Sequence, residues 1–455
     1  MRERDLRKQA LESGKTVSRA ARSKLTTPSS SRANSATPSR VGSRLPSRNA
    51  SDDDEDGLSD TTQWSTASID EMISPPGGGE ELEGEGTDAW VGVLESQMEE
   101  IVERKRSSAQ GREEALRMFC ALVTRHYAAE QLKGRTGELV AAMLKSVKGA
   151  GSGKEVVLAL KALALVVVTE PSDEVYDALS GPVKTCISDS AFPAAKVAGL
   201  RCLSVATFYG GATLEETEGV MEFLLDVVSS DGAVVGEMDD SAIVTAAIEE
   251  WGFLATQMED LEEGTETAME TFVEQLESAS AEVQIAAGDC IALLYEKSYT
   301  DAESDEEPAE EDEDEDQTNG HNHGPRMVKR YTVYRNLPQL LSTLTALSKL
   351  SSKHLSKKDR KQLHITFSDI LTTVEKPTRG PRYSTALDEE GREMGSRLKV
   401  AVGRGGGRMT IDKWWKLHRL HGLKRLLGEG FLVHYAGNQV VFDKVVEVEV
   451  EVEES

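Results

Sequence analysis

The chain has 455 residues, a formal net charge of −27, 38% hydrophobic residues and only 5% aromatic residues. Both fractions are low for a compact protein of this size, which indicates that long stretches of the chain do not fold. The longest apolar run, residues 156–169, is shorter than the ~20 residues that cross a bilayer, and no apolar segment follows the basic N-terminus, so neither a membrane span nor a secretory signal is expected.

Residues 1–85 form the first segment, which is rich in Ser and Arg and then acidic. The first 50 residues contain twelve Lys/Arg against three Asp/Glu, and Asp52–Asp56 begins the acidic part. This segment has too little apolar surface to offset the entropy lost on folding. We therefore predict that residues 1–85 are disordered.

Residues 86–300 show apolar positions at helical spacing, separated by glycines and acidic breaks. Leu116, Leu160 and Leu200 stand in similar runs, 44 and 40 residues apart, and two later runs that begin at Thr245 and Ile285 are again 40 apart. A repeat of about 40 residues is typical of paired helices in HEAT or armadillo stacks. The fold class predicted is all-α, an α-solenoid of about five units. The alternative is an irregular helical bundle.

One glycine-rich segment, Gly149–Lys154, looks like a phosphate-binding loop. Lys148 stands where the first glycine is needed, and Glu155 replaces the Ser or Thr that would hold Mg²⁺. We interpret the segment as a loop between helices. Nucleophile, metalloprotease and paired-carboxylate motifs are not recognised, so we predict no enzyme, no cofactor and no small-molecule substrate.

Metal sites are not expected either. The four cysteines are widely spaced and form no CxxC pair, which indicates a reducing compartment. Residues 301–325 form an acidic tract with twelve Asp/Glu in 301–316, and the tract ends near His321 and His323. Nothing fixes these ligands, so we expect a disordered acidic linker.

Residues 324–444 are basic, with twenty-four Lys/Arg against ten Asp/Glu. Within them we predict a basic helical segment over 326–380, which continues the helical pattern to about 375, and a small helical domain over 381–444. The latter includes a Trp-bearing basic helix over 411–427 and a short hairpin over 431–441. Residues 445–455 form an acidic tail.

Two basic clusters in this region are the candidate nucleic-acid contacts. Lys and Arg neutralise phosphates without reading sequence, and exposed aromatic rings stack on unpaired bases. The candidate RNA-binding residues are Lys353, Lys357, Lys358, Arg360, Lys361, Lys413, Trp414, Lys416, Arg419, Lys424, Arg425 and His434. The alternative for the basic clusters is a solvated helix face with at least one tryptophan in the core. For His434, a structural role as a cap is as plausible as an RNA contact.

Three motifs occur in order in the C-terminal half. They are Lys357-Lys-Asp-Arg-Lys followed by Phe367-Ser-Asp-Ile-Leu, then Ile411-Asp-Lys-Trp, then Leu426-Leu-Gly-Glu-Gly-Phe-Leu-Val-His-Tyr-Ala-Gly-Asn. Together they resemble the interferon-related developmental regulator family. The resemblance implies an armadillo-like fold and a regulator of gene expression, since family members are described as transcriptional co-regulators and as ribosome-associated repressors of translation. Acidic residues replace the polybasic tail of some animal members.

These observations predict a non-enzymatic adaptor. Its helical repeats are expected to bind protein partners, and residues 326–430 to contact ribosomal or other RNA. The alternative is a nuclear transcriptional co-regulator that binds partners through the repeat groove. Both cytoplasmic and nuclear localisation are expected, without a membrane partner.

Overall fold

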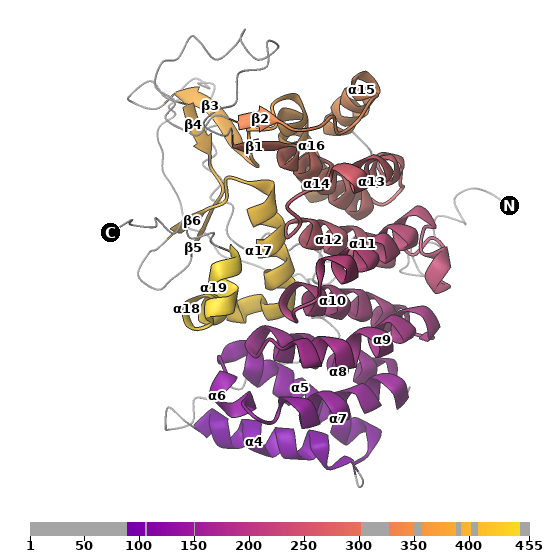
Figure 1. Cartoon of the computed structure of the whole chain (residues 1–455), viewed down its shortest axis with the longest axis vertical. Helices are drawn as coiled ribbons and strands as arrows, with labels where there is room; N and C mark the ends of the chain where they lie inside the picture. The colour runs from indigo at the N-terminus through magenta and orange to yellow at the C-terminus, as the bar shows by residue number, and fades with distance from the viewer. Residues whose placement is uncertain are drawn as a thin grey trace, which may run out of the picture. The chain divides into compact units, whose positions relative to one another are not determined.

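The computed structural model describes residues 89–104, 107–149, 151–301, 327–349, 357–387, 393–401 and 408–445. The disorder predicted over residues 1–85, most of the acidic tract and nearly all of the acidic tail lie outside these residues. Within the described residues, helices dominate and pack against one another, which confirms the all-α prediction in its coarse form (Figure 1).

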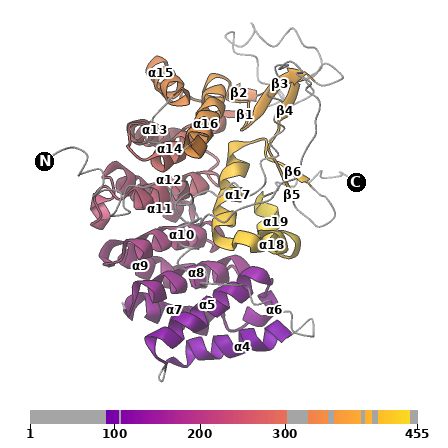
Figure 2. The same cartoon turned by 180° about the vertical axis from the view of Figure 1, so that it is seen from behind.

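The helices stack in two rows (Figures 1 and 2). The inner row, in which each helix packs on the next, consists of α5 (Ala109–Arg125), α8 (Gly153–Thr169), α10 (Pro193–Tyr209), α12 (Ser241–Ala255), α14 (Ala281–Lys297) and α16 (Lys357–Glu375). The outer row consists of α4 (Ala89–Val102), α7 (Thr136–Gly149), α9 (Asp173–Asp189), α11 (Leu214–Ser229), α13 (Glu262–Gln275) and α15 (Leu337–Ser348). Each outer helix pairs with the inner helix that follows it. The short helices α6 (Ala129–Leu132) and η2 (Ala233–Val235) lie in the connections.

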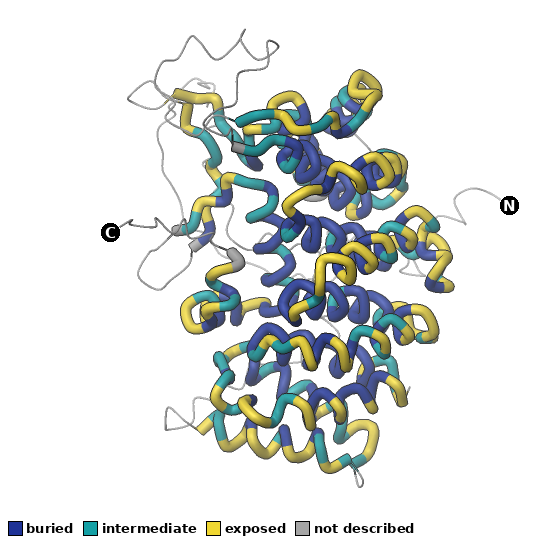
Figure 3. Tube along the Cα trace, viewed as in Figure 1, coloured by how far each residue is buried: buried dark blue, intermediate teal, exposed yellow. Residues whose placement is uncertain are grey.

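The inner helices α8, α10, α12 and α14 are buried on nearly every side, whereas α5 and α16, toward the ends of the row, bury one face (Figure 3). In α8 only Gly153, Lys154 and Lys161 are not buried. A helix that is apolar all round needs neighbours all round, and α8 has them in α5, α7 and α10. The same run, 156–169, was the longest apolar stretch of the sequence. Among the described residues, no helix has both the length and the hydropathy that a membrane span requires.

Side-chain caps explain where several helices begin. Ser108, Ser152 and Ser280 each accept a hydrogen bond from a backbone N–H in the first turn of α5, α8 and α14. At α11, Thr213 and Glu216 form a reciprocal capping box. Such caps satisfy N–H groups that have no partner inside the helix.

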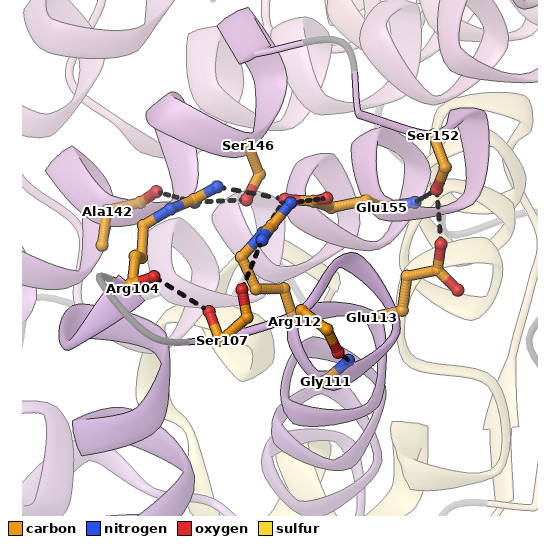
Figure 4. Close-up of polar contacts among 10 residues, drawn as sticks. Arg104, Ser107, Gly111, Arg112, Glu113, Ala142, Ser146, Ser152 and Glu155 are labelled. Atoms are coloured by element: carbon orange, nitrogen blue, oxygen red, sulfur yellow. Dashed lines mark hydrogen bonds and ion pairs between the residues drawn. The ribbon is translucent and has the colours of Figure 1, made fainter.

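The glycine-rich loop before α8 leads into a buried ion-pair network (Figure 4). The Glu155 side chain is 1% exposed, and Arg112 donates to both of its oxygens at 2.8 and 2.9 Å. Arg104 donates to Glu155 Oε1 at 3.1 Å and to the Ala142 carbonyl at 2.8 Å. Burial acts to raise the pKa of Glu155, but the hydrogen bonds from Arg112 and Ser146, together with the charges of Arg112 and Arg104, outweigh it and hold the pKa below its usual value. Glu155 thus ties α8 to α5 and to the end of α4.

The stack continues beyond the acidic tract. Strand β1 (Tyr299–Asp301) pairs antiparallel with β2 (Met327–Lys329), so the two ends of the tract meet. After β2, α15 and α16 form the next helix pair, and α16 packs on α14 as the earlier inner helices pack on each other.

The C-terminal segment contains elements that the all-α prediction did not include. Strand β3 (Tyr383–Leu387) pairs with β4 (Glu393–Ser396), and β5 (Lys399–Ala401) pairs with β6 (Arg408–Thr410). They are followed by α17 (Trp414–Leu427), η3 (Gly428–Gly430), α18 (Phe431–Gly437) and α19 (Gln439–Val445).

The hairpin predicted over 431–441 is wrong, because this segment is helical on both sides of Asn438. The Asn438 side chain accepts from the Val440 N–H at 3.0 Å and donates to the Val168 carbonyl at 2.9 Å. Phe431 and His434 are buried at helical spacing. Tertiary packing against α5 and α8 therefore overrides the strand propensity of the Phe-Leu-Val run.

Candidate nucleic-acid interface

The predicted contact residues fall at separate places along α16 and α17. Lys353 lies outside the described residues, and Lys357 and Lys358 lie on α16 with side chains that are not described. Arg360 is half-buried and Lys361 is exposed. The start of α17 meets the other end of α16, at Thr373, about 20 Å from Arg360 along the helix axis. The two predicted clusters therefore do not form one patch.

Helix α17 lies along the inner row and contacts α14, α12 and α8 (Figures 1 and 2). Its first turn meets the Glu296 carboxylate of α14, which accepts from the backbone N–H groups of Trp414 at 2.8 Å and Trp415 at 3.1 Å. A carboxylate at this end satisfies two unpaired N–H groups and complements the helix dipole. Burial nevertheless raises the pKa of Glu296 to about 7.

This pKa predicts how stability depends on pH. Between about pH 5 and pH 7 the folded chain keeps a proton on Glu296 that the unfolded chain has lost, so the unfolding free energy should fall as pH rises. We expect Glu296→Gln to remove about 2 kcal/mol of this dependence, as measured by urea unfolding at about pH 5 and about pH 8. Glu263→Gln, at an exposed position of α13, is the control. An identical pH dependence in both variants would contradict the prediction.

Trp414 and Arg419 are part of the core. Trp414 is 1% exposed and donates from Nε1 to Thr373 Oγ1 at 2.8 Å. Arg419 is 7% exposed and donates to the hydroxyl of Thr256 at 3.0 Å and to its carbonyl at 2.9 Å. Its guanidinium also lies over the rings of Phe208 and Trp415. Neither side chain is available to RNA in this arrangement.

Arg425 is committed to acidic partners on α12. It donates to Glu250 at 3.0 Å and lies 3.6 Å from Glu249. Close approach of the two helices depends on glycines on both. A Cβ at Gly252 would lie 2.6 Å from the His418 ring, and one at Gly422 would lie 2.9 Å from the Phe253 ring. Burial lowers the pKa of His418 to about 4, so this ring is neutral at pH 7.

His434 is the last of the buried candidates. It is fully buried, and its Nε2 lies 2.9 Å from the Val123 carbonyl of α5. The RNA contact predicted for Trp414, Arg419, Arg425 and His434 is therefore not retained. Their hydrogen-bond partners lie between 41 and 311 residues away in the sequence, which is why the local pattern did not show them.

A smaller set of basic side chains remains at the surface. Lys413 and Lys416 are half-buried at the start of α17, and Arg397 and Lys399 are exposed beside β4 and on β5. We call these four residues the basic surface. Two contacts join the parts of the chain that carry these residues. The Ser396 hydroxyl donates to the Ile411 carbonyl at 2.7 Å, and Lys399 pairs with Thr410 between strands β5 and β6. Sequence reasoning missed Arg397 and Lys399, which stand outside the basic runs.

The chemistry of this surface is limited to charge. Trp415 is half-buried, and both Arg419 and Lys416 lie over its ring, at 4.6 and 5.4 Å from the centroid. Trp414 is buried and Trp415 is half-buried, so neither tryptophan of the segment is a fully exposed ring for base stacking. Among the described residues, no group of three or more His, Cys, Asp or Glu side chains is arranged to hold a metal ion.

Comparison with known proteins relates the whole stack to one family. A family profile described as Interferon-related developmental regulator matches residues 58–375. An uncharacterized protein of Schizosaccharomyces pombe is 30% identical over 357 residues, 77% of this chain and 73% of that protein. Interferon-related developmental regulator 1 of Sus scrofa is 22% identical over 85% of this chain and 78% of its own length. Interferon-related developmental regulator 2 of Mus musculus is 24% identical over 75% and 70%. The profile ends where α16 ends, before the hairpins and α17.

Proposed function

The chain belongs to the interferon-related developmental regulator family, and on that premise we propose that it is a non-enzymatic regulator of gene expression that works as an adaptor. In this proposal the paired helices form an α-solenoid that presents a surface to protein partners, and the C-terminal segment contacts ribosomal or other RNA. The two rows of paired helices support the first part. The basic surface supports the second. Such an adaptor would work in the cytoplasm and in the nucleus.

The observation that carries the RNA contact is the position of the basic surface. Arg397 and Lys399 are exposed, and Lys413 is half-buried, where its charge also acts on the Glu296 carboxyl. Lys416 pairs with Asp412 at 2.8 Å, in a bond that solvent screens. Four cations without a stacking ring favour phosphate contacts, which position an RNA without reading its bases. We therefore propose that structured, double-helical RNA is the form bound.

A fourfold variant tests this contact. Replacing Arg397, Lys399, Lys413 and Lys416 with alanine should reduce the slope of log affinity against log salt by up to about 3. It should weaken binding to an RNA hairpin about 100-fold at low salt, because each phosphate contact releases counterions. The measurement is fluorescence anisotropy with the full chain, since α17 packs on helices from most of the stack.

The matched control removes four exposed lysines elsewhere on the stack, Lys133, Lys145, Lys148 and Lys154. It changes the net charge by the same amount and should leave the salt slope within about 1 of the wild type. Equal losses in both variants would show a general charge effect and would contradict a localised interface.

The second candidate function is a nuclear transcriptional co-regulator that binds protein partners through the helical repeats. A specific feature favours it. The inner row is not fully covered by α17, and a cleft lies beside this helix, between α8, α10 and α12. A pull-down with the full chain tests this function. A protein partner that is recovered with the wild type and lost with a variant altered in the cleft would support it.

A further inference from the structure

The chain at the start of β5 has one basic side and one apolar side. Arg397 and Lys399 are exposed, whereas Leu398 is half-buried and Val400 is 4% exposed. Successive side chains of an extended chain point to opposite sides, so the two cations share one side and the two apolar residues share the other. Neither cation forms an ion pair with a carboxylate of the described residues.

One edge of β5 faces away from β6. The Ile411 N–H donates to the Leu398 carbonyl at 2.9 Å, and Lys399 lies opposite Thr410 in the ladder. Neighbouring residues of a strand direct their backbone groups to opposite edges, so the N–H and C=O groups of Lys399 and Ala401 point away from β6. Within the described residues this sheet has two strands. An edge of this kind is a template for a further strand.

The sequence beyond α19 complements this edge. Residues 446–455, which lie outside the described residues, have valine at 446, 448, 450 and 452, glutamate at 447, 449, 451, 453 and 454, and no basic residue. Valine and glutamate thus alternate with the period of a strand, in which they would occupy opposite faces. Paired with β5, such a strand places carboxylates beside Arg397 and Lys399 and valines beside Leu398 and Val400.

The acidic tail is long enough to reach β5. Helix α19 ends at Val445 and packs on α17, and it lies below the β5–β6 hairpin in the view of Figure 1. Helix α17 has 14 residues, about 21 Å at 1.5 Å per residue, and only residues 411–413 separate its start from β6. Residues 446–455 span about 33 Å when extended. They therefore reach the hairpin from any point along α17.

The β3–β4 hairpin is a poorer match for the same segment. Its register shifts between Ser384 and Leu387, so its ladder is irregular. Glu393 on β4 already places a carboxylate there and pairs with Arg379 at 3.3 Å. Leu387 and Met394 are 63% and 51% exposed, so they offer no covered apolar face for the valines. Both the charge and the pattern therefore favour β5.

From the matching alternation, the unpaired edge and the reach of the chain, we infer that residues 446–453 dock on β5 as a third strand. The docked strand covers Arg397 and Lys399. Its role rests on the proposed function, because these two cations belong to the proposed RNA contact and the tail carboxylates then compete with phosphates for them. With an effective concentration of roughly 1 mM and a dissociation constant of roughly 0.1 mM, the docked state outweighs the open state about 10-fold.

Amide hydrogen exchange of the full chain tests the docking without RNA. The comparison variant keeps the composition of residues 446–455 but places the four valines before the five glutamates and the serine, so it keeps the charge and loses the alternation. The N–H groups of Lys399 and Ala401 should exchange about 10-fold more slowly in the wild type than in this variant. Equal exchange in the two chains would overturn the docking.

A pair of single substitutions separates pairing from net charge. Arg397→Glu should remove most of the protection at Lys399 and Ala401, because it repels the glutamates of the tail. Lys145→Glu, at an exposed position of α7, changes the charge equally and should leave the exchange within about twofold of the wild type. Comparable loss of protection in both variants would also overturn the docking.

Fluorescence anisotropy with an RNA hairpin at about 50 mM salt tests the inhibitory role. The rearranged tail should raise the RNA affinity of the full chain about 10-fold, because the two cations are then uncovered while the net charge is unchanged. Equal RNA affinity in the two chains would overturn the inhibition. If neither chain bound RNA, the proposed RNA contact and the inhibition would both fall, and the exchange result would still decide whether the strand docks.

Discussion

Replacing Trp414 with alanine is expected to lower the unfolding free energy by about 3–5 kcal/mol. The side chain is 1% exposed and fills the junction of α14, α16 and α17, and its Nε1–H donates to Thr373. The substitution removes the transfer free energy of an indole and leaves a cavity that the surrounding helices fill only in part. Chemical denaturation of the full chain measures the change.

The control for this prediction is the next residue. Trp415 is half-buried and carries Arg419 and Lys416 over its ring. Trp415→Ala should lower the unfolding free energy by only about 1–2 kcal/mol, because a half-buried ring buries less apolar surface than the Trp414 ring does. If Trp415→Ala cost more than Trp414→Ala, the assignment of Trp414 to the core and of Trp415 to its margin would be wrong.

The second large effect is expected at Glu155. Glu155→Ala should lower the unfolding free energy by about 3 kcal/mol, because it leaves the arginines at positions 104 and 112 without their carboxylate. Breaking a buried pair costs about 3–5 kcal/mol, and the lower end applies because both arginine side chains are about one-fifth exposed.

Glu114→Ala removes the same charge from a surface pair. Glu114 is 57% exposed and bonds Arg117 within α5, so its loss should cost less than about 1 kcal/mol. Denaturation at pH 7 measures both variants. If Glu114→Ala and Glu155→Ala lowered the unfolding free energy by comparable amounts, a structural role for the network in Figure 4 would be contradicted.

Sequence reasoning located the inner row of helices well. Leu116, Leu160 and Leu200, which marked the repeat, lie on α5, α8 and α10 and are at most 2% exposed. The two later runs fall on α12 and α14. This agreement has a physical cause, because each inner helix is enclosed on several sides and needs apolar and small residues at matching positions.

Contacts between residues that are distant in the sequence leave no trace in the local pattern. The charges of α17 resemble a solvated basic face, yet Arg425 is neutralised by Glu250, 175 residues earlier, and Arg419 by polar groups of Thr256, 163 residues earlier. Residues 431–437 have strand-forming composition, yet burial of Phe431 and His434 against the stack makes them a helix. Local propensity carries no information about such partners.

The central claim is that a stack of paired helices carries its RNA contact on the basic surface, while Arg419 and Arg425 of α17 hold that helix in place. Sucrose-gradient fractionation of a lysate tests this claim most directly. At about 100 mM salt the wild type should travel with ribosomal fractions, and the variant with alanine at 397, 399, 413 and 416 should remain near the top. A wild type that stays at the top, or a variant that sediments with ribosomes as the wild type does, would contradict the claim.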